Sequence, residues 1–283
     1  HPSASYSAAN RLLEGSSDII TQQLVQAMIL IDRGMPIVHI LQTSQRNSLV
    51  LVSRSDTLRT FDDLKGKKVG VWKSGFGDLA YIMDSEKNLD IQWIPYLESV
   101  DIFLSGAIDA IMAMSYNEYL KIKVSGHEDK PVIRFSETEY DYPEDGVYVS
   151  TDFYQRYPDK VKAFVEASRK GWEWAHEHPE ETLDIVMKWA ERENVHTNRI
   201  HQQWMLEQIL EIQCKDGEKK PSFHSDRYQF TVIMPNLNYG EEINSKVSNE
   251  ALEMRFLNLL KQQPDLIQKE MIVMLDTSRA TLQ

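Results

Sequence analysis

Three polar residues, Tyr116, Asn117 and Glu118, directly follow an almost wholly apolar run, Ala110–Met114. The run is typical of a strand that is buried on both faces. A carboxylate and a carboxamide at the end of such a strand can bind a ligand, because Glu118 accepts hydrogen bonds and Asn117 accepts or donates them. The alternative is that Glu118 caps a helix or lies in solvent. As a binding residue, Glu118 is expected to tolerate substitution by Ala with loss of ligand binding and an intact fold.

A second candidate binding segment, KSGFGD, follows the predicted strand Lys68–Trp72. Its glycines allow the backbone to approach a ligand closely, and Ser74 can donate a hydroxyl. The segment matches neither the Walker pattern nor G-x-G-x-x-G, which argues against nucleotide binding. A turn that offers N–H groups to an anionic or polar ligand competes with a plain structural turn.

Aromatic residues also lie at the ends of the predicted parallel strands: Trp72, Phe76 and Tyr116. Each alone is typical of a core residue, but ligands of open α/β sheets bind at the carboxyl ends of the strands. A planar, nitrogen-bearing ligand could stack on these rings while Glu118 and Asp145 accept hydrogen bonds from its N–H groups. Two carboxylates could also act as general acid and base. Since no nucleophile or metal motif accompanies them, the sequence predicts a binding protein and no enzyme.

Other chemistry finds no support in the motifs. The sequence contains no G-x-S-x-G, H-E-x-x-H or aspartate-rich calcium loop. Cys214 is the only cysteine, which excludes an internal disulfide and a multi-cysteine metal site. His176 and His178 fall on different faces of a predicted helix. His201 lies near Trp204 in a segment that we expect to be a packed helix. We therefore expect no metal and no cofactor.

Composition bounds the class of protein. The chain has 283 residues, of which 42% are hydrophobic, and a net charge of −12. These values fit one or two globular domains and argue against nucleic acid or an anionic membrane as the main partner. No apolar run approaches the roughly 18 residues of a transmembrane helix. Residues 1–10 lack the features of a signal peptide, and we expect any signal or anchor to lie outside this sequence.

An internal match indicates how the chain is organised. The segments LLEGSSDII (12–20) and FLSGAIDAI (103–111) share a pattern typical of a helix ended by a left-handed glycine, a turn and a buried strand. Continuous β-rich runs separated by helical stretches such as residues 22–33 predict parallel strands with helices on both faces. The expected class is α/β.

The second half of the chain is expected to be helical. Pro158 and Pro179 are expected at the first turns of two helices, and a third is expected at about residues 199–213. Two further helices are predicted at about residues 250–260 and 266–275.

Six motifs occur in a family-like order: QRNSLVLVSR, DLKGKKVGVWKSGF, AMSYNEYL, PEDGVYV, AFVEASRKGWEWAHEHPEE and HQQWML. With them the chain resembles the thiamine-pyrimidine-precursor binding and synthase-like family, which shares the type II periplasmic binding protein fold. The resemblance implies two α/β lobes with a ligand cleft between them. The first lobe would comprise residues 1–55 and 152–235, with its N-terminal part truncated. Residues 56–151 would form the inserted second lobe, and residues 236–283 a helical tail or linker.

The resemblance also implies a set of ligand-binding residues. They comprise the ends of two predicted strands, a turn and one earlier glutamine: Trp72, Ser74, Gly75, Phe76, Tyr116, Asn117, Glu118, Asp145, Gly146 and Gln42.

Three functions are compatible with the resemblance. The first is a periplasmic solute-binding protein that passes a small heterocycle, such as a hydroxymethylpyrimidine, to membrane transporter subunits. The second is the extracytoplasmic sensor region of a membrane-embedded histidine kinase, with C-terminal helices that lead to the membrane or join two copies. The third is a pyrimidine synthase, which the single Cys214 disfavours because that branch carries a cysteine-rich iron-binding motif.

Overall fold

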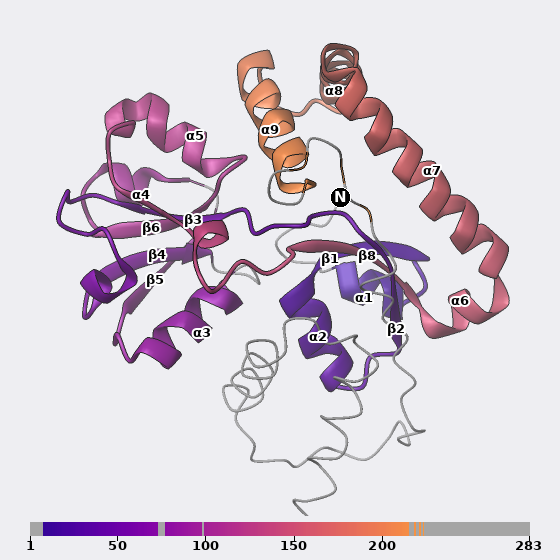
Figure 1. The fold of residues 1–283 in the computed structure, drawn as a ribbon, viewed down its shortest axis with the longest axis horizontal. Helices are drawn as coiled ribbons and strands as arrows, with labels where there is room; N and C mark the ends of the chain where they lie inside the picture. The colour runs from indigo at the N-terminus through magenta and orange to yellow at the C-terminus, as the bar shows by residue number, and fades with distance from the viewer. Residues whose placement is uncertain are drawn as a thin grey trace, which may run out of the picture. The chain divides into compact units, whose positions relative to one another are not determined.

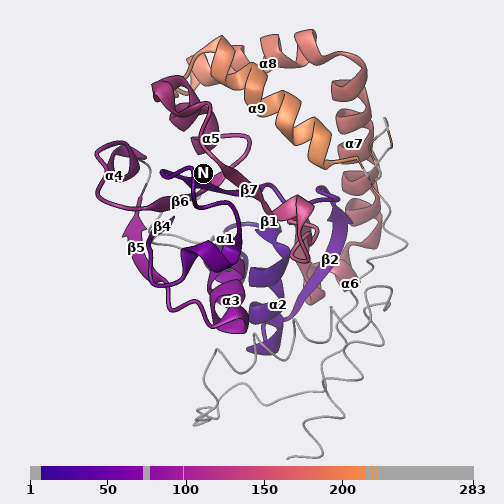
Figure 2. The same cartoon turned by 60° about the vertical axis from the view of Figure 1, so that its left-hand side comes forward.

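A computed structural model describes residues 8–72, 77–97 and 99–214, together with Glu218, Pro221 and Phe223. Helices and strands alternate through the first half of the chain, and helices follow (Figures 1 and 2). The strands are β1 (Ile19–Gln23), β2 (Ile37–Gln42), β3 (Leu49–Ser53), β4 (Lys68–Trp72), β5 (Gln92–Tyr96), β6 (Ala110–Met114), β7 (Val132–Arg134) and β8 (Asp145–Ser150). The helices are α1 (Ala8–Leu13), α2 (Leu24–Asp32), η1 (Phe61–Leu64), α3 (Asp78–Lys87), α4 (Asp101–Leu104), α5 (Glu118–Ile122), η2 (Lys123–His127), η3 (Phe135–Glu137), α6 (Thr151–Arg156), α7 (Pro158–Glu177), α8 (Pro179–Arg192) and α9 (Arg199–Ile212).

The described residues group into two compact units by their contacts. One unit contains residues 8–43 and 145–165, and the other contains residues 44–144 and 166–223. The contacts thus place most of α7 and all of α8 and α9 with the second unit, whereas the sequence predicts residues 152–235 in the first lobe. The domain boundaries stay a prediction.

The first unit contains a three-stranded sheet in the order β1-β8-β2. Both pairings are antiparallel, and Tyr148 of β8 lies opposite Ile20 on one side and His39 on the other. Helices α1 and α2 pack on this sheet. Their shared core is a set of buried apolar side chains: Ala9, Leu12, Ile20, Ala27, Met35, Ile37 and Tyr148.

The second unit contains a five-stranded sheet in the order β5-β4-β6-β3-β7. Strand β4 pairs parallel with β5 and β6, and β3 pairs antiparallel with β6 and β7. Helix α3 lies on one face of this sheet, while α4 and α5 lie on the other (Figures 1 and 2). All residues of β3 and β6 are buried, as the apolar runs predict.

The expectation of mostly parallel strands is wrong for the first sheet, where both pairings are antiparallel, and in the second sheet only two of the four described pairings are parallel. Strand β2 ends at Gln42, where the chain passes into the second unit. The chain returns to the first unit at Asp145, beside the end of β2, because Gln42 pairs with Gly146. The returning strand β8 must therefore run back against β2. An apolar run indicates that a strand is buried, but it carries no information on the direction of the strand's neighbours.

The internal repeat is confirmed in its local geometry. Helix α1 is followed by Gly15 with φ 71° and by β1, and α4 is followed by Gly106 with φ 82° and by β6. These positive φ angles are strained for any residue with a Cβ, which explains the glycines.

Two further expectations concern helices. The predicted starts at Pro158 and Pro179 are confirmed, since α7 and α8 begin at these residues. The predicted helices beyond residue 228, and the tail at 236–283, lie outside the described residues. Among the helices that the structure describes, none is both long and apolar enough to cross a membrane.

Candidate functional site

Three parallel strands of the second unit end at one edge of its sheet. Trp72 closes β4, Tyr96 closes β5 directly opposite it, and Met114 closes β6. The Trp72 and Tyr96 rings lie 5.6 Å apart, and both side chains are buried. The Tyr96 hydroxyl donates to the Met112 carbonyl at 2.7 Å. The predicted site residue Trp72 is therefore a buried aromatic at this edge, positioned by its neighbour on β5.

The chain turns at residues 115–117, between β6 and α5, and we call this segment the turn behind β6. The carboxylate of Glu118 closes it. Its Oε2 accepts from the Met114 backbone N–H at 3.0 Å, and its Oε1 accepts from Asn117 Nδ2 at 3.1 Å. Glu118 is buried with 7% of its surface exposed, while Tyr116 and Asn117 stay partly exposed. Burial, with a further contribution from the nearby Glu118 charge, raises the pKa of Tyr96. Glu118 thus shapes the turn that presents Tyr116 and Asn117.

Helix α9 contacts this turn. His201 Nε2 lies 3.0 Å from Asn117 Oδ1, and Trp204 Nε1 donates to the Ser115 carbonyl at 2.8 Å. The ammonium group of Lys123 lies 4.8 Å from the centre of the Trp204 ring, within range of a cation–π interaction. Burial, followed by the Lys121 charge, lowers the pKa of His201.

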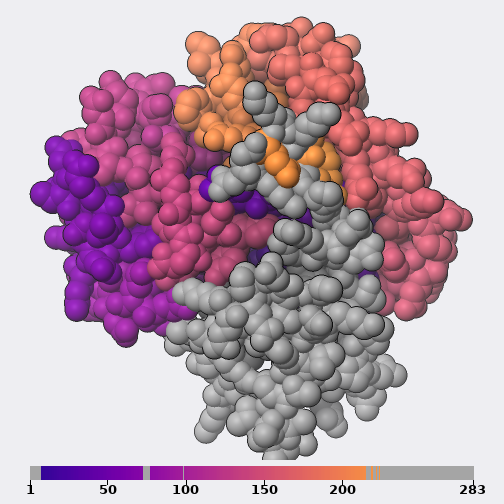
Figure 3. Space-filling model, in the orientation of Figure 1, coloured from indigo at the N-terminus to yellow at the C-terminus, as the bar shows by residue number. Residues whose placement is uncertain are grey.

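Helices α8 and α9 form one continuous part of the surface (Figure 3). The sequence already held a signal for the α9 contact, because His201 and Trp204 are three residues apart and so share one helix face. Treating His201 only as part of a packed helix missed its hydrogen bond to Asn117.

The corresponding edge of the first unit holds the remaining predicted residues. Gln42 Nε2 and Thr43 Oγ1 both donate to the Asp145 carbonyl, at 2.6 and 2.8 Å. Burial raises the pKa of the Asp145 carboxyl to about 6. A Cβ at Gly146 would lie 2.5 Å from His39 Nε2, so close packing requires glycine there. Gly146 therefore serves the packing of β8 against β2.

The structure divides the predicted site residues into two groups. Trp72, Tyr116, Asn117 and Glu118 lie at the edge of the second sheet. Gln42, Asp145 and Gly146 lie at the edge of the first sheet. Three predicted residues, Ser74, Gly75 and Phe76, lie outside the described residues.

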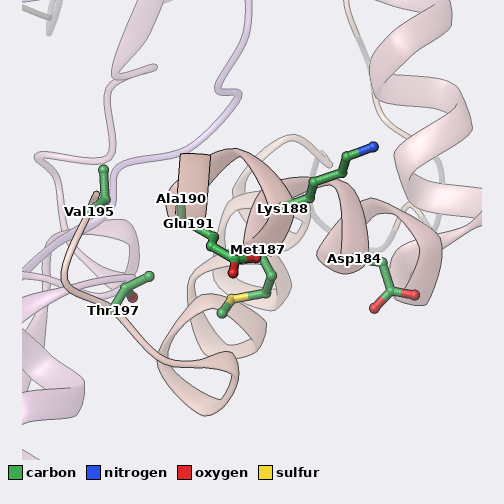
Figure 4. Close-up of a pocket in the computed structure, with 7 residues that line it drawn as sticks. All are labelled: Asp184, Met187, Lys188, Ala190, Glu191, Val195 and Thr197. Atoms are coloured by element: carbon green, nitrogen blue, oxygen red, sulfur yellow. The ribbon is translucent and has the colours of Figure 1, made fainter. Parts of the chain in front are cut away.

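A hollow of about 500 Å³ lies elsewhere, along α8 and its connection to α9. Figure 4 shows that Asp184 and Lys188 point away from Val195 and Thr197. Within the described part of the chain, no group of three His, Cys, Asp or Glu side chains is arranged to hold a metal ion.

Comparison with solved structures shows the fold. The chain is similar to the periplasmic aliphatic sulphonate binding protein SsuA from Escherichia coli, with 16% identity, a TM-score of 0.56, and coverage of 70% of this chain and 68% of that one. It is also similar to the alkanesulfonate-binding protein SsuA from Xanthomonas axonopodis pv. citri bound to MOPS, with 14% identity, a TM-score of 0.56, and coverage of 71% and 69%.

A third similar structure is a putative sulfonate ABC transporter component, the periplasmic sulfonate-binding protein SsuA from Methylobacillus flagellatus KT. The identity is 18% and the TM-score 0.51, with coverage of 72% of this chain and 61% of that one. These likenesses confirm the predicted fold class, an α/β, two-lobed type II periplasmic binding protein fold with sheets flanked by helices.

Among curated proteins, none matches this sequence significantly. One family model does match, over residues 1–182, which is more than half of the chain. By that match, the chain belongs to the NMT1/THI5-like family.

Proposed function

We propose that the protein binds a small planar heterocycle resembling the pyrimidine of thiamine, and that the turn behind β6 supplies part of the binding surface. The observation that carries this proposal is the conformation of Asn117. The buried Glu118 and the α9 residue His201 hold its carboxamide from two sides, yet Asn117 stays partly exposed. A fixed polar group beside buried aromatic residues is typical of a site that orients a small ligand.

The family match and the structural likenesses support a solute-binding role. The pyrimidine class rests on the resemblance of the sequence motifs to the thiamine-pyrimidine-precursor family, and the chain matches the NMT1/THI5-like family model, whereas the similar solved structures are named as sulfonate-binding proteins. A sulfonate is therefore the second ligand class to test. Its oxygens only accept hydrogen bonds, and the amide group of Asn117 can donate one.

The location and partners follow from the same proposal. The protein would act outside the cytoplasm and deliver its ligand to the membrane subunits of an ABC transporter, without enzymatic activity. The alternative is the sensor region of a membrane histidine kinase with a different ligand. A coding sequence that continues into a transmembrane helix and a kinase domain would favour the sensor. The position of the ligand between the lobes, and lobe closure as the output, stay predictions.

A thermal-shift screen tests the ligand class. Its panel contains hydroxymethylpyrimidine, thiamine, flavins, purines and alkanesulfonates. A ligand at a hundred times its Kd stabilises the folded state by about 2.7 kcal/mol, which gives a measurable rise in melting temperature. We expect the rise with hydroxymethylpyrimidine and a smaller rise when Asn117 is replaced by Ala. If alkanesulfonates stabilise the protein and no heterocycle does, the pyrimidine assignment must be dropped.

A further inference from the structure

The hydrogen bonds around Asn117 determine which way its carboxamide points. The ionised carboxylate of Glu118 only accepts hydrogen bonds, and one of its oxygens already accepts from the Met114 N–H. The side-chain atom of Asn117 that lies 3.1 Å from the other oxygen must therefore be the amide nitrogen. Rotating the carboxamide by half a turn would set its carbonyl oxygen against that carboxylate.

The same reasoning assigns the proton of His201. With Nδ2 directed at Glu118, the Asn117 atom facing His201 is Oδ1, which only accepts. His201 Nε2, 3.0 Å away, must then carry a hydrogen. The result is a directed series in which His201 donates to Asn117, and Asn117 donates to Glu118.

One hydrogen of the Asn117 amide group remains after this series is complete. The amide nitrogen carries two hydrogens, and Glu118 takes one of them. Asn117 is partly exposed, so its remaining hydrogen is available at the surface of the turn. Glu118, by contrast, is buried and binds a hydrogen with each oxygen, which makes it a poor acceptor for an outside group.

We propose that Asn117 donates a hydrogen bond to the ligand, that the ligand group bound at this turn is an acceptor, and that His201 is the positioning residue that orients Asn117. The inference rests on the proposed function, because it requires a ligand at this turn. By this inference, the ligand group that contacts the second unit is a hydrogen-bond acceptor, such as a ring nitrogen or an acid oxygen. The sequence predicts the opposite polarity here, with Glu118 accepting from an N–H of the ligand.

Helix α9 is held well enough to serve this role. The Trp204 indole donates to the Ser115 carbonyl in the same turn, and the Trp204 ring lies 6.3 Å from the ring of Tyr119 on α5. At the end of α9, the Ile212 carbonyl accepts from the Gln45 backbone N–H at 2.7 Å. Contacts at Trp204 and at the C-terminal end of the helix thus hold His201 near Asn117.

Two substitutions at one position separate positioning from packing. His201→Phe keeps a planar ring but removes the N–H, whereas His201→Gln restores an N–H donor at a similar distance from the backbone. Gln203→Ala is the matched control, because Gln203 is exposed on the same helix and its side chain bonds only to Glu207 among the described residues. Calorimetry measures the affinity of each variant, and thermal unfolding checks that each one folds.

Three probes define the chemical class of the ligand group. They are hydroxymethylpyrimidine, a carbocyclic analogue with both ring nitrogens replaced by C–H, and ethanesulfonate. We expect the wild-type protein to bind at least one of the two acceptor probes and to bind the carbocyclic analogue at least tenfold more weakly than the pyrimidine. We expect His201→Phe to weaken binding of the acceptor probe about tenfold, or about 1.4 kcal/mol, and His201→Gln to restore most of it. Gln203→Ala should bind as the wild type does.

The outcomes distinguish this inference from the proposed function. Failure of the wild-type protein to bind hydroxymethylpyrimidine would count against the proposed function, and ethanesulfonate would then be the acceptor probe for the inference. Equal binding of the pyrimidine and its carbocyclic analogue, or equal affinity of the wild type and His201→Phe, would overturn the inference alone. Imidazole ¹⁵N shifts of the ligand-free protein give an independent result. A hydrogen on Nε2 of neutral His201 supports the series, and a hydrogen on Nδ1 only contradicts it whichever probe binds.

Discussion

The two copies of the helix–glycine–strand repeat differ in what surrounds the strand. Strand β6 lies between β4 and β3, and all five of its residues are buried. Strand β1 pairs only with β8 among the described residues, and only Ile20 of its five residues is buried. Similar sequence patterns therefore produce the same local geometry, while the neighbouring strands decide how much of each copy is buried.

The copies also differ directly after the strand. If the alignment of Ile20 with Ile111 is continued, Ala27 takes the place of Glu118. Ala27 is fully buried in α2, a helix that begins at once after β1. In the second copy a turn of three residues precedes α5, and Glu118 closes it by accepting the Met114 N–H. Glutamate therefore occurs in the copy where a polar turn precedes the helix, and alanine occurs in the copy where the helix begins directly after the strand.

The largest expected difference between the copies concerns their buried isoleucines. Ile111→Ala should lower the free energy of unfolding by about 4 kcal/mol, because strands on both sides prevent the cavity from collapsing. Ile20→Ala in the edge strand should cost about 2 kcal/mol, since the neighbouring side chains can relax. Urea unfolding, monitored by hydrogen exchange, measures the free energies of unfolding of both variants. Equal costs would mean that β1 is as constrained as β6.

The carboxyl group of Asp145, at the edge of the first sheet, should make the stability of the protein depend on pH. Burial raises its pKa from 3.8 to about 6, so the folded state binds more protons than the unfolded state between these pH values. The contribution of Asp145 to stability is therefore greatest below pH 4 and falls by up to about 3 kcal/mol as the pH rises through 6.

Asp145→Asn should remove that pH dependence. Subtracting its urea-unfolding free energies from those of the wild type isolates the effect from other carboxyl groups. A difference that stays constant from pH 4 to pH 7 would contradict a raised pKa at Asp145.

Glu118 should contribute stability at the corresponding edge of the second sheet. Glu118→Ala leaves the buried Met114 N–H without its acceptor and should cost about 2 kcal/mol. Glu118→Gln keeps a carbonyl oxygen and should cost less. The structure thus adds a stability cost to the expectation from sequence that the alanine variant loses ligand binding and keeps an intact fold. Unfolding in urea measures both variants, and an alanine variant as stable as the wild type would contradict this cost.

The glycines that end the repeated helices should show the smallest difference. Gly15→Ala should cost about 1 kcal/mol, because φ is positive but the space around the new Cβ is open. Gly106→Ala should cost more, since its Cβ would lie 3.1 Å from the Arg54 guanidinium. That group donates to the Phe103 carbonyl at 2.7 Å and would have to move. The melting temperatures of the two variants measure this difference in stability. Equal shifts would show that the Arg54 guanidinium can move at no cost in stability.

Much of the local structure was predictable from the sequence. Strands Lys68–Trp72 and Ala110–Met114 and the left-handed glycines were predictable because apolar runs and turn residues act over a few positions. The antiparallel insertion of β8 was not, because strand direction depends on where the chain returns.

The candidate site was predictable only in part. The sequence indicated Asn117 and Glu118, and the structure places both at the end of β6. It did not reveal that Glu118 accepts the Met114 N–H or that His201 reaches Asn117. A helical pattern in α9 shows which residues share a face, but it does not identify the surface that this face contacts.

Calorimetric titration with hydroxymethylpyrimidine tests the central claim most directly, with the wild-type protein and Asn117→Ala compared. The account predicts saturable binding by the wild type and at least tenfold weaker binding by the variant, which should remain folded although loss of the hydrogen bond to Glu118 costs it about 2 kcal/mol of stability. Equal affinities, or no binding by a folded wild-type protein, would contradict the assignment of a pyrimidine-binding site to the turn behind β6.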